Sequence, residues 1–221
     1  MKKDFYLIVG VVALVASLFF GAQLIYKKTT TSVENGAQPQ LPLRADLSLL
    51  VKDWSPNLGP SMSRIIVVEF LDPECESCSA MHPIVKAVLK DYEGRIRYVL
   101  RYMPFHKNSE LAAKWLEAAR EQGKFWEALN ILFEKQAEWA AHHSPRPELI
   151  PSILKDIGIN VKQAIVALEN PEFEKRIRQD KEDGTRAGVT GTPTFFVNGR
   201  VLQNLGDAPL RALIEEELNA Q

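Results

Sequence analysis

Residues 69–78 read Glu-Phe-Leu-Asp-Pro-Glu-Cys-Glu-Ser-Cys and contain both cysteines of the 221-residue chain. The apolar, β-branched run Ile65-Ile66-Val67-Val68 precedes this stretch and predicts a strand. Residues 79–89, which follow it, predict a helix. The cysteine pair is therefore expected at a strand-to-helix turn, and the rest of the chain is interpreted outward from this turn.

The two cysteines are expected to differ in reactivity. Cys75 precedes the helix, where unpaired backbone N–H groups and the positive end of the helix dipole favour a thiolate. Cys78 lies one turn into the predicted helix, where burial keeps a thiol inert until a mixed disulfide forms beside it. Cys75 is thus the predicted nucleophile and Cys78 the predicted resolving thiol.

Composition narrows the possible functions. With 46% hydrophobic residues and a formal net charge of −1, the chain can bury one sizeable core. No basic stripe is interleaved with aromatic residues, so nucleic acid is not an expected partner. A bridge between two cysteines this close in sequence would add little stability. The value of the pair must lie in its reactivity or in metal binding.

The N-terminal residues predict a membrane anchor. No charged residue occurs from Phe5 to Tyr26, and a helix of this length, at about 1.5 Å per residue, crosses a bilayer core. A cleaved signal peptide is the alternative, although no clean small-x-small cleavage site follows Phe20. Residues 1–28 are expected to be an uncleaved transmembrane helix, and residues 29–46, which are polar and aperiodic, a tether.

The sequence predicts the orientation of this helix in the membrane less directly, because Lys2 and Lys3 before the apolar segment are matched by Lys27 and Lys28 after it. The free amino terminus favours a cytoplasmic N-terminus. We therefore expect a single-pass protein of the cytoplasmic (inner) membrane whose folded domain lies on the periplasmic or extracytoplasmic side.

The order of elements predicts an α/β domain at residues 47–221. Strands are expected at residues 47–51, 64–70 and 95–102, with a loop at residues 54–63 and a turn at residues 91–94. Helices are expected from Asn108 or Ser109 to Gly123, around residues 125–133, at residues 149–157, from Asn160, and from Pro171 to about residue 187. A hairpin around Asn198-Gly199 and a helix from Asp207 complete the domain. The helical subdomain at about residues 105–188 thus interrupts a β-sheet core.

Four separated features carry a family resemblance. They are the Cys75-Glu76-Ser77-Cys78 motif, Pro83 in the helix after it, Gly191-Thr192-Pro193-Thr194 directly before the predicted hairpin, and Glu69. Together they resemble the thioredoxin-fold superfamily, specifically its DsbA-like branch with a helical insertion. The resemblance implies a thioredoxin fold and a protein thiol–disulfide oxidoreductase that works through a redox-active Cys75–Cys78 disulfide without a cofactor.

The resemblance also implies roles for Thr192, Pro193 and Glu69. A cis bond between Thr192 and Pro193 would leave the backbone of Thr192 free to pair with an extended substrate over Cys75; an ordinary trans-proline is the alternative. A buried Glu69 would have a raised pKa and could take the proton of Cys78 as a general base. A solvent-facing glutamate is the alternative there.

The residues around Cys75 leave the direction of exchange open. Glu74 and Glu76 are expected to raise the pKa of Cys75 against the helix dipole. Ser77 cannot supply the positive charge that a histidine inside the pair supplies in strongly oxidising DsbA proteins. The resemblance therefore favours oxidation, whereas the local charges favour a milder oxidase, a reductase or an isomerase.

A copper or zinc chaperone is a further alternative, because Cys75, Cys78 and His82 could supply three ligands. A fourth ligand is missing from the motif, and a strand-to-helix turn is the setting that thiol exchange needs. No metal is therefore expected.

Partners follow from the resemblance. It implies protein thiol and disulfide substrates and a membrane redox partner of the quinone-linked DsbB or vitamin K epoxide reductase type. A monomer is expected, because isomerases of this superfamily carry a dimerisation region ahead of the fold and here only a short tether precedes it.

Overall fold

The computed structural model describes residues 44–141 and 143–220. The predicted transmembrane helix and nearly all of the predicted tether lie outside these residues. None of the helices within the described part of the chain combines the length and the apolar character that a membrane span requires.

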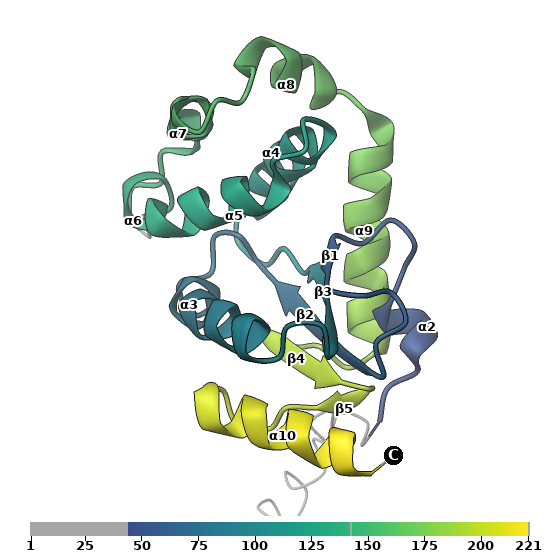
Figure 1. Ribbon diagram of the computed structural model, residues 1–221. Helices are drawn as coiled ribbons and strands as arrows, with labels where there is room; N and C mark the ends of the chain where they lie inside the picture. The colour runs from purple at the N-terminus through teal and green to yellow at the C-terminus, as the bar shows by residue number, and fades with distance from the viewer. Residues whose placement is uncertain (1–43, 142, 221) are drawn as a thin grey trace, which may run out of the picture. The chain divides into compact units, whose positions relative to one another are not determined.

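A mixed sheet of five strands, in the order β1-β3-β2-β4-β5, forms the centre of the described domain (Figure 1). β2 (Ile65–Leu71) and β3 (Ile96–Tyr102) are parallel neighbours. β1 (Asn57–Leu58) pairs antiparallel with β3, and β4 (Thr194–Val197) pairs antiparallel with β2. β5 (Arg200–Val201) completes the hairpin with β4.

The central strands are buried on both faces. Val67 and Leu71 of β2 pack into one hydrophobic core, and Val68 and Phe70 pack into a second core across the sheet. Successive residues of a strand point to opposite faces, so Glu69 shares the face of Val67 and Leu71. Burial on both faces explains why the strand reads as a continuous apolar run, and the alternation directs Glu69 to the side of the cysteines.

Helices cover both faces of the sheet (Figure 1). α3 (Glu76–Asp91) and α10 (Asp207–Asn219) contribute to the core that contains Val67. α2 (Leu47–Leu50) lies on the other face together with the C-terminal part of α9 (Pro171–Arg186), where Gly184 packs against Phe70. Phe173 and Ile177, nearer the start of α9, belong to the first core. The remaining helices of the insertion share the first core and are α4 (Ser109–Glu121), α5 (Phe125–Glu134), α6 (Gln136–Trp139), η1 (Pro147–Leu149), α7 (Ile150–Asp156) and α8 (Val161–Ala167).

Most predicted elements are confirmed. The strand predicted at residues 64–70, the cysteine helix and the strand at residues 95–102 each match β2, α3 and β3 to within three residues. In the hairpin, Asn198 and Gly199 have positive φ angles of 47° and 87°, as a tight two-residue turn requires.

Three details differ from the sequence prediction. Residues 47–50 of the predicted strand at 47–51 form the short helix α2 instead, because the Asp46 carboxylate accepts the Ser48 N–H at 2.8 Å and caps its first turn. Asn57 and Leu58, predicted within a loop, form β1 by pairing with β3. The helix α6 was not predicted; the Trp139 indole in it donates to the carbonyl oxygen of Leu132.

Candidate active site

The cysteine pair lies where β2 passes into α3. Cys75 is the N-cap residue of α3 and Cys78 lies in its first turn, which confirms the predicted strand-to-helix placement. The Cys75 N–H donates to the carbonyl oxygen of Asp72 at 3.1 Å and closes the turn. Both residues are free cysteines; Cys75 is 8% exposed and Cys78 is fully buried. Cys75 is therefore the sulfur that a substrate can reach.

Hydrogen bonds at the end of α3 favour a thiolate at Cys75. A bond from the Cys78 thiol lowers the pKa of Cys75 most, while burial opposes it. Hydrogen bonds from the Thr192 side chain and from the backbone of Cys78 and Ser77 add to the effect, and the pKa falls to about 5. The pKa of Cys75 is therefore lowered, as expected for a thiolate at the start of a helix, and neither Glu74 nor Glu76 is among the main causes of its shift.

The contacts of Glu74 explain why its charge is not a main cause of the shift at Cys75. Its carboxylate is buried and accepts the Asn108 N–H at 2.7 Å and the Asn108 side-chain amide at 2.9 Å, at the start of α4. These donors balance its charge. Glu76 and Ser77 are exposed on the first turn of α3, where solvent screens the carboxylate of Glu76.

Glu69 is buried on the cysteine side of the sheet, as predicted, and the Tyr98 hydroxyl donates to its carboxylate. Burial raises the pKa of Glu69 to about 7; the Tyr98 bond opposes the rise and the charge of Cys75 adds to it. Burial also raises the pKa of Cys78 far above its usual value, and the hydrogen bond to Cys75 and the charge of Glu69 act in the same direction. Near neutral pH, Cys78 therefore stays protonated, and the Glu69 carboxyl group can either give up or accept a proton.

The loop before β4 completes the site from a distant part of the chain. The Thr192–Pro193 peptide bond is cis, and Pro193 is buried. The Cys75 thiol donates to the Thr192 carbonyl oxygen at 3.3 Å across 117 positions of sequence. The pairing of Phe70 with Thr194 between β2 and β4 places this loop beside the cysteine turn.

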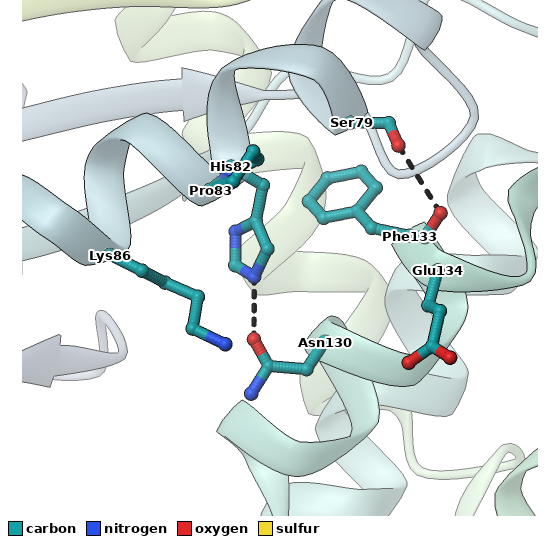
Figure 2. A pocket seen from close by; sticks show the side chains of 7 residues that line it. All are labelled: Ser79, His82, Pro83, Lys86, Asn130, Phe133 and Glu134. Carbon is teal, nitrogen blue, oxygen red and sulfur yellow. Dashed lines mark hydrogen bonds between the residues drawn. The ribbon is translucent and has the colours of Figure 1, made fainter. Parts of the chain in front are cut away.

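His82 faces α5 from the side of α3 (Figure 2). Its Nε2 donates to the Asn130 side-chain oxygen at 2.5 Å, and its ring lies 5.0 Å from that of Phe133, centroid to centroid. Burial lowers the pKa of His82 despite the bond to Asn130. Together with Ser79, Pro83, Lys86 and Glu134, these residues line a cleft of about 230 Å³.

The three-ligand set of the metal alternative is not assembled. In residues 44–141 and 143–220, no three histidine, cysteine, aspartate or glutamate side chains are grouped so that they could hold a metal ion. His82 is instead bound to Asn130.

The sequence analysis missed three residues that hold the active-site turn. Asp72 is fully buried and accepts the Glu74 N–H at 2.8 Å. His106, for which no partner was identified from sequence, places Nδ1 2.7 Å from the Asp72 carboxylate. Gln136 of α6 donates to the carbonyl oxygens of Pro73 and Cys75 at 3.0 and 3.1 Å. Asp72 could have been noticed, since a carboxylate at the end of a buried strand needs several donors.

Curated relatives share the region of the cysteine pair. The Na(+)/H(+) antiporter NhaA of Herminiimonas arsenicoxydans is 31% identical over 150 residues, which are 68% of this chain and 23% of the antiporter. The chain thus spans about a fifth of the length of the first curated relatives that it matches. The disulfide bond formation protein D of Bacillus subtilis is 28% identical over 178 residues, which cover 75% of this chain and 78% of that protein.

Solved structures and the family comparison agree with the geometry. The crystal structure of oxidised BdbD from Bacillus subtilis has a TM-score of 0.68 at 26% identity and covers 80% of this chain and 96% of that chain. Residues 53–216 match the family described as thioredoxin. Because the matched residues carry the cysteine turn, the buried glutamate and the cis-proline loop, the chain belongs to the thioredoxin family.

Proposed function

We propose that this protein is a thiol–disulfide oxidoreductase that oxidises the thiols of other proteins through its Cys75–Cys78 disulfide. The observation that carries the proposal is the pKa of Cys75, which hydrogen bonds, chiefly from the Cys78 thiol, lower to about 5. A thiolate that is stabilised in the reduced protein makes the corresponding disulfide a stronger oxidant. The similarity to disulfide bond formation protein D supports the same direction.

The exchange begins when a substrate thiolate attacks the Cys75 sulfur of the Cys75–Cys78 disulfide. A bond forms between the substrate sulfur and Cys75, and the Cys75–Cys78 bond breaks. Cys78 leaves with the electron pair and takes a proton, for which the protonated carboxyl group of the buried Glu69 is the proposed source. A second substrate thiolate then attacks the substrate sulfur and releases Cys75 as a thiolate. The substrate loses two electrons and the protein gains them.

The loop before β4 is the proposed contact for the substrate chain. Thr192 lies against Cys75 and is half-buried, so its backbone can pair with an extended segment that presents a cysteine to Cys75. Pro193 has no N–H and is buried behind it. The substrates proposed are therefore proteins with accessible cysteines in extended segments.

Membrane attachment and reoxidation belong to the same proposal. We propose that residues 1–28 anchor the domain on the extracytoplasmic side of the cytoplasmic membrane, because residues 5–26 carry no charge. Reduced protein would be reoxidised by a membrane partner of the DsbB or vitamin K epoxide reductase type. The protein is proposed to act as a monomer.

Reduction or isomerisation of substrate disulfides is the second candidate, and the state of Glu69 favours it. With a pKa of about 7, Glu69 can accept the Cys78 proton at neutral pH. In this direction the Cys75 thiolate attacks a substrate disulfide, and the deprotonated Cys78 then attacks Cys75 and releases the reduced substrate. The same residues serve both directions, so the potential of the couple decides between them.

The deciding experiment is the equilibrium potential of the Cys75–Cys78 couple in the full-length protein, poised in glutathione buffers at pH 7 and read by thiol trapping. A value near about −120 mV supports oxidation, and a value near about −270 mV supports reduction and overturns the oxidase proposal. Cys75→Ser should abolish exchange, whereas Cys78→Ser should accumulate a mixed disulfide at Cys75. Exchange that continues in Cys75→Ser would contradict both candidates.

A further inference from the structure

We infer that the imidazolium of His106, held against the active-site turn by Asp72, is a positive charge that favours the Cys75 thiolate and makes the Cys75–Cys78 disulfide more oxidising. The inference rests on the proposed exchange at Cys75 and adds a positioning and charge-supplying residue from the loop between β3 and α4. Ser77, which lies between the cysteines, carries no charge that could stabilise the Cys75 thiolate.

The Asp72 side chain binds this loop to the cysteine turn. Its Oδ2 accepts the Phe105 N–H at 2.7 Å, the His106 N–H at 3.1 Å and the His106 Nδ1–H at 2.7 Å. Its Oδ1 accepts the Ser109 hydroxyl, and its carbonyl oxygen accepts the Cys75 N–H at 3.1 Å. One fully buried residue therefore fixes the loop and the turn to each other.

Glu74 makes a second connection between the same two segments. Its carboxylate accepts both the backbone N–H and the side-chain amide of Asn108. Hydrogen bonds to ionised acceptors are stronger than those between neutral groups, so residues 72–75 and 105–109 form one rigid unit. The position of His106 relative to Cys75 is thus set by buried contacts.

The charge of His106 follows from its surroundings. Nδ1 of His106 lies 2.7 Å from the Asp72 carboxylate, which stabilises the charged imidazolium over the neutral ring, and the side chain is 35% exposed to solvent. Burial lowers the pKa of His106, but the hydrogen bond and charge of Asp72 outweigh burial. The charges of Cys75 and Glu74 add to the rise, and the pKa ends above its ordinary value.

Coupling between two charged sites is reciprocal, so a Cys75 thiolate that raises the pKa of His106 is stabilised by His106 to the same extent. This contribution adds to the larger one from the hydrogen bonds at the end of α3. Lys107 is the next cation in the chain, but its side chain is exposed, where its charge is screened. Removing the charge of His106 should therefore raise the pKa of Cys75, whereas removing the charge of Lys107 should not.

The test compares full-length His106→Asn with the matched control Lys107→Gln. Asparagine keeps a side-chain N–H for Asp72 and removes the charge, so the loop stays in place. The pKa of Cys75, read from the pH dependence of its alkylation, should rise by about half a unit in His106→Asn. The equilibrium constant with glutathione should move about threefold toward a less oxidising disulfide, or about 14 mV. Lys107→Gln should change neither.

A second measurement uses the wild-type protein and does not depend on any variant folding. The His106 imidazole is titrated by NMR in the reduced and in the disulfide form, and its pKa should be about half a unit higher in the reduced form, where the thiolate is present. Equal values in the two forms overturn the inference.

The remaining outcomes are also decisive. An unchanged Cys75 pKa in His106→Asn, or an equal shift in Lys107→Gln, overturns the role of His106 while exchange by the wild-type protein still supports the proposed function. A wild-type protein that exchanges no disulfides with glutathione overturns the proposed function itself.

Discussion

At the scale of single residues, the site consists of neighbouring groups whose pKa values are shifted in opposite directions. Hydrogen-bond donors lower the pKa of Cys75 to about 5. Burial raises the pKa of Cys78 and brings the pKa of Glu69 to about 7. Near neutral pH the site therefore contains one thiolate, one thiol and a carboxyl group that can give or accept a proton. Such divided roles are typical of catalytic sites.

The Cys75 thiolate gives a direct prediction for the reduced protein. Its alkylation rate should follow a titration with a midpoint near pH 5, instead of the ordinary pKa of 9.0. The folded pKa is depressed, so the thiolate contributes stability that is fully present above pH 9 and lost as the pH falls through 5. Iodoacetamide kinetics of the reduced wild-type protein, with alkylation at Cys75 identified by peptide mass, measure the midpoint while the Cys78 thiol that lowers the pKa stays in place. A midpoint near 9 would show that the donors around Cys75 do not act.

Glu69 gives a prediction in which the free energy of unfolding falls, instead of rising, as the pH increases. Its folded pKa of about 7 lies above the ordinary value of 4.5, so ionisation of Glu69 opposes folding as the pH rises from 4.5 through 7. Glu69→Gln should raise the free energy of unfolding by up to about 3 kcal/mol at pH 8 and leave it nearly unchanged at pH 4. Urea denaturation at both pH values measures the difference. The exposed Glu93→Gln is the control, and an equal gain at pH 4 and pH 8 would refute the assignment.

At the scale of elements, the helix α9 and the strand β2 meet at a position where only glycine fits. A Cβ atom on Gly184 would lie 2.9 Å from the Phe70 ring and 3.0 Å from the Met103 sulfur. Helix propensity alone favours alanine over glycine in a helix interior by about 1 kcal/mol. Glycine at this position therefore lowers the intrinsic stability of the helix but allows the helix to pack close to the sheet.

Gly184→Ala should accordingly destabilise the protein by about 1–3 kcal/mol, because the loss from overpacking exceeds the gain in propensity. Thermal unfolding measures the change. Glu182→Ala, at an exposed position of the same helix, should stay within about 0.5 kcal/mol of wild type. A more stable Gly184→Ala protein would mean that Phe70 and Met103 move aside without cost.

The elements that sequence predicts well are those that short-range signals define. The run before Cys75, the Asn198-Gly199 turn and the Asn170 cap of α9 each act within a few residues. The two-residue strand β1 forms because β3 lies beside it and pairs with it, and no local sequence pattern predicts this strand. Residues 47–51 show the opposite case. Their apolar pattern predicts a strand, but the hydrogen bond from the Ser48 N–H to the Asp46 carboxylate starts a short helix there instead.

At the scale of the whole molecule, a buried ion network joins the sheet to the helices on one of its faces. Arg101 of β3 is fully buried; its Nε contacts Asp180 at 2.8 Å and one terminal nitrogen contacts Asp183 at 2.9 Å, both on α9. Its other terminal nitrogen donates to the Leu49 carbonyl oxygen in α2 at 2.7 Å. One side chain thus connects three elements that are far apart in sequence.

Arg101→Met should destabilise the protein by about 3–5 kcal/mol, because it leaves buried carboxylates without their partner. Lys175→Ala, which removes an exposed ion pair with Glu172, should cost less than about 1 kcal/mol. Urea denaturation of the two variants measures both changes. Comparable losses would contradict the distinction between the buried network and the exposed pair.

Much of the candidate site was predictable from sequence, because its residue types rarely occur at such positions for packing alone. A cysteine pair after an apolar strand, a glutamate inside that strand and a proline before a hairpin each indicate the site by position. The proximity of Thr192 to Cys75 follows from the resemblance to the thioredoxin-fold superfamily. The buried Asp72, the His106 beside it and Gln136 of α6 were missed, since the contacts that join them across the site span at least 33 residues.

The sequence by itself determined most of the order of strands and helices, the cysteine turn and the identity of the reactive residues, because these depend on periodicity and on neighbours a few positions away. Only the tertiary structure decided the charges around the site. It turned Glu74 toward α4, fixed His106 to Asp72 and buried Arg101 against α9. The physical reason is that a pKa depends on burial and on every nearby charge, and folding brings those together from distant parts of the chain.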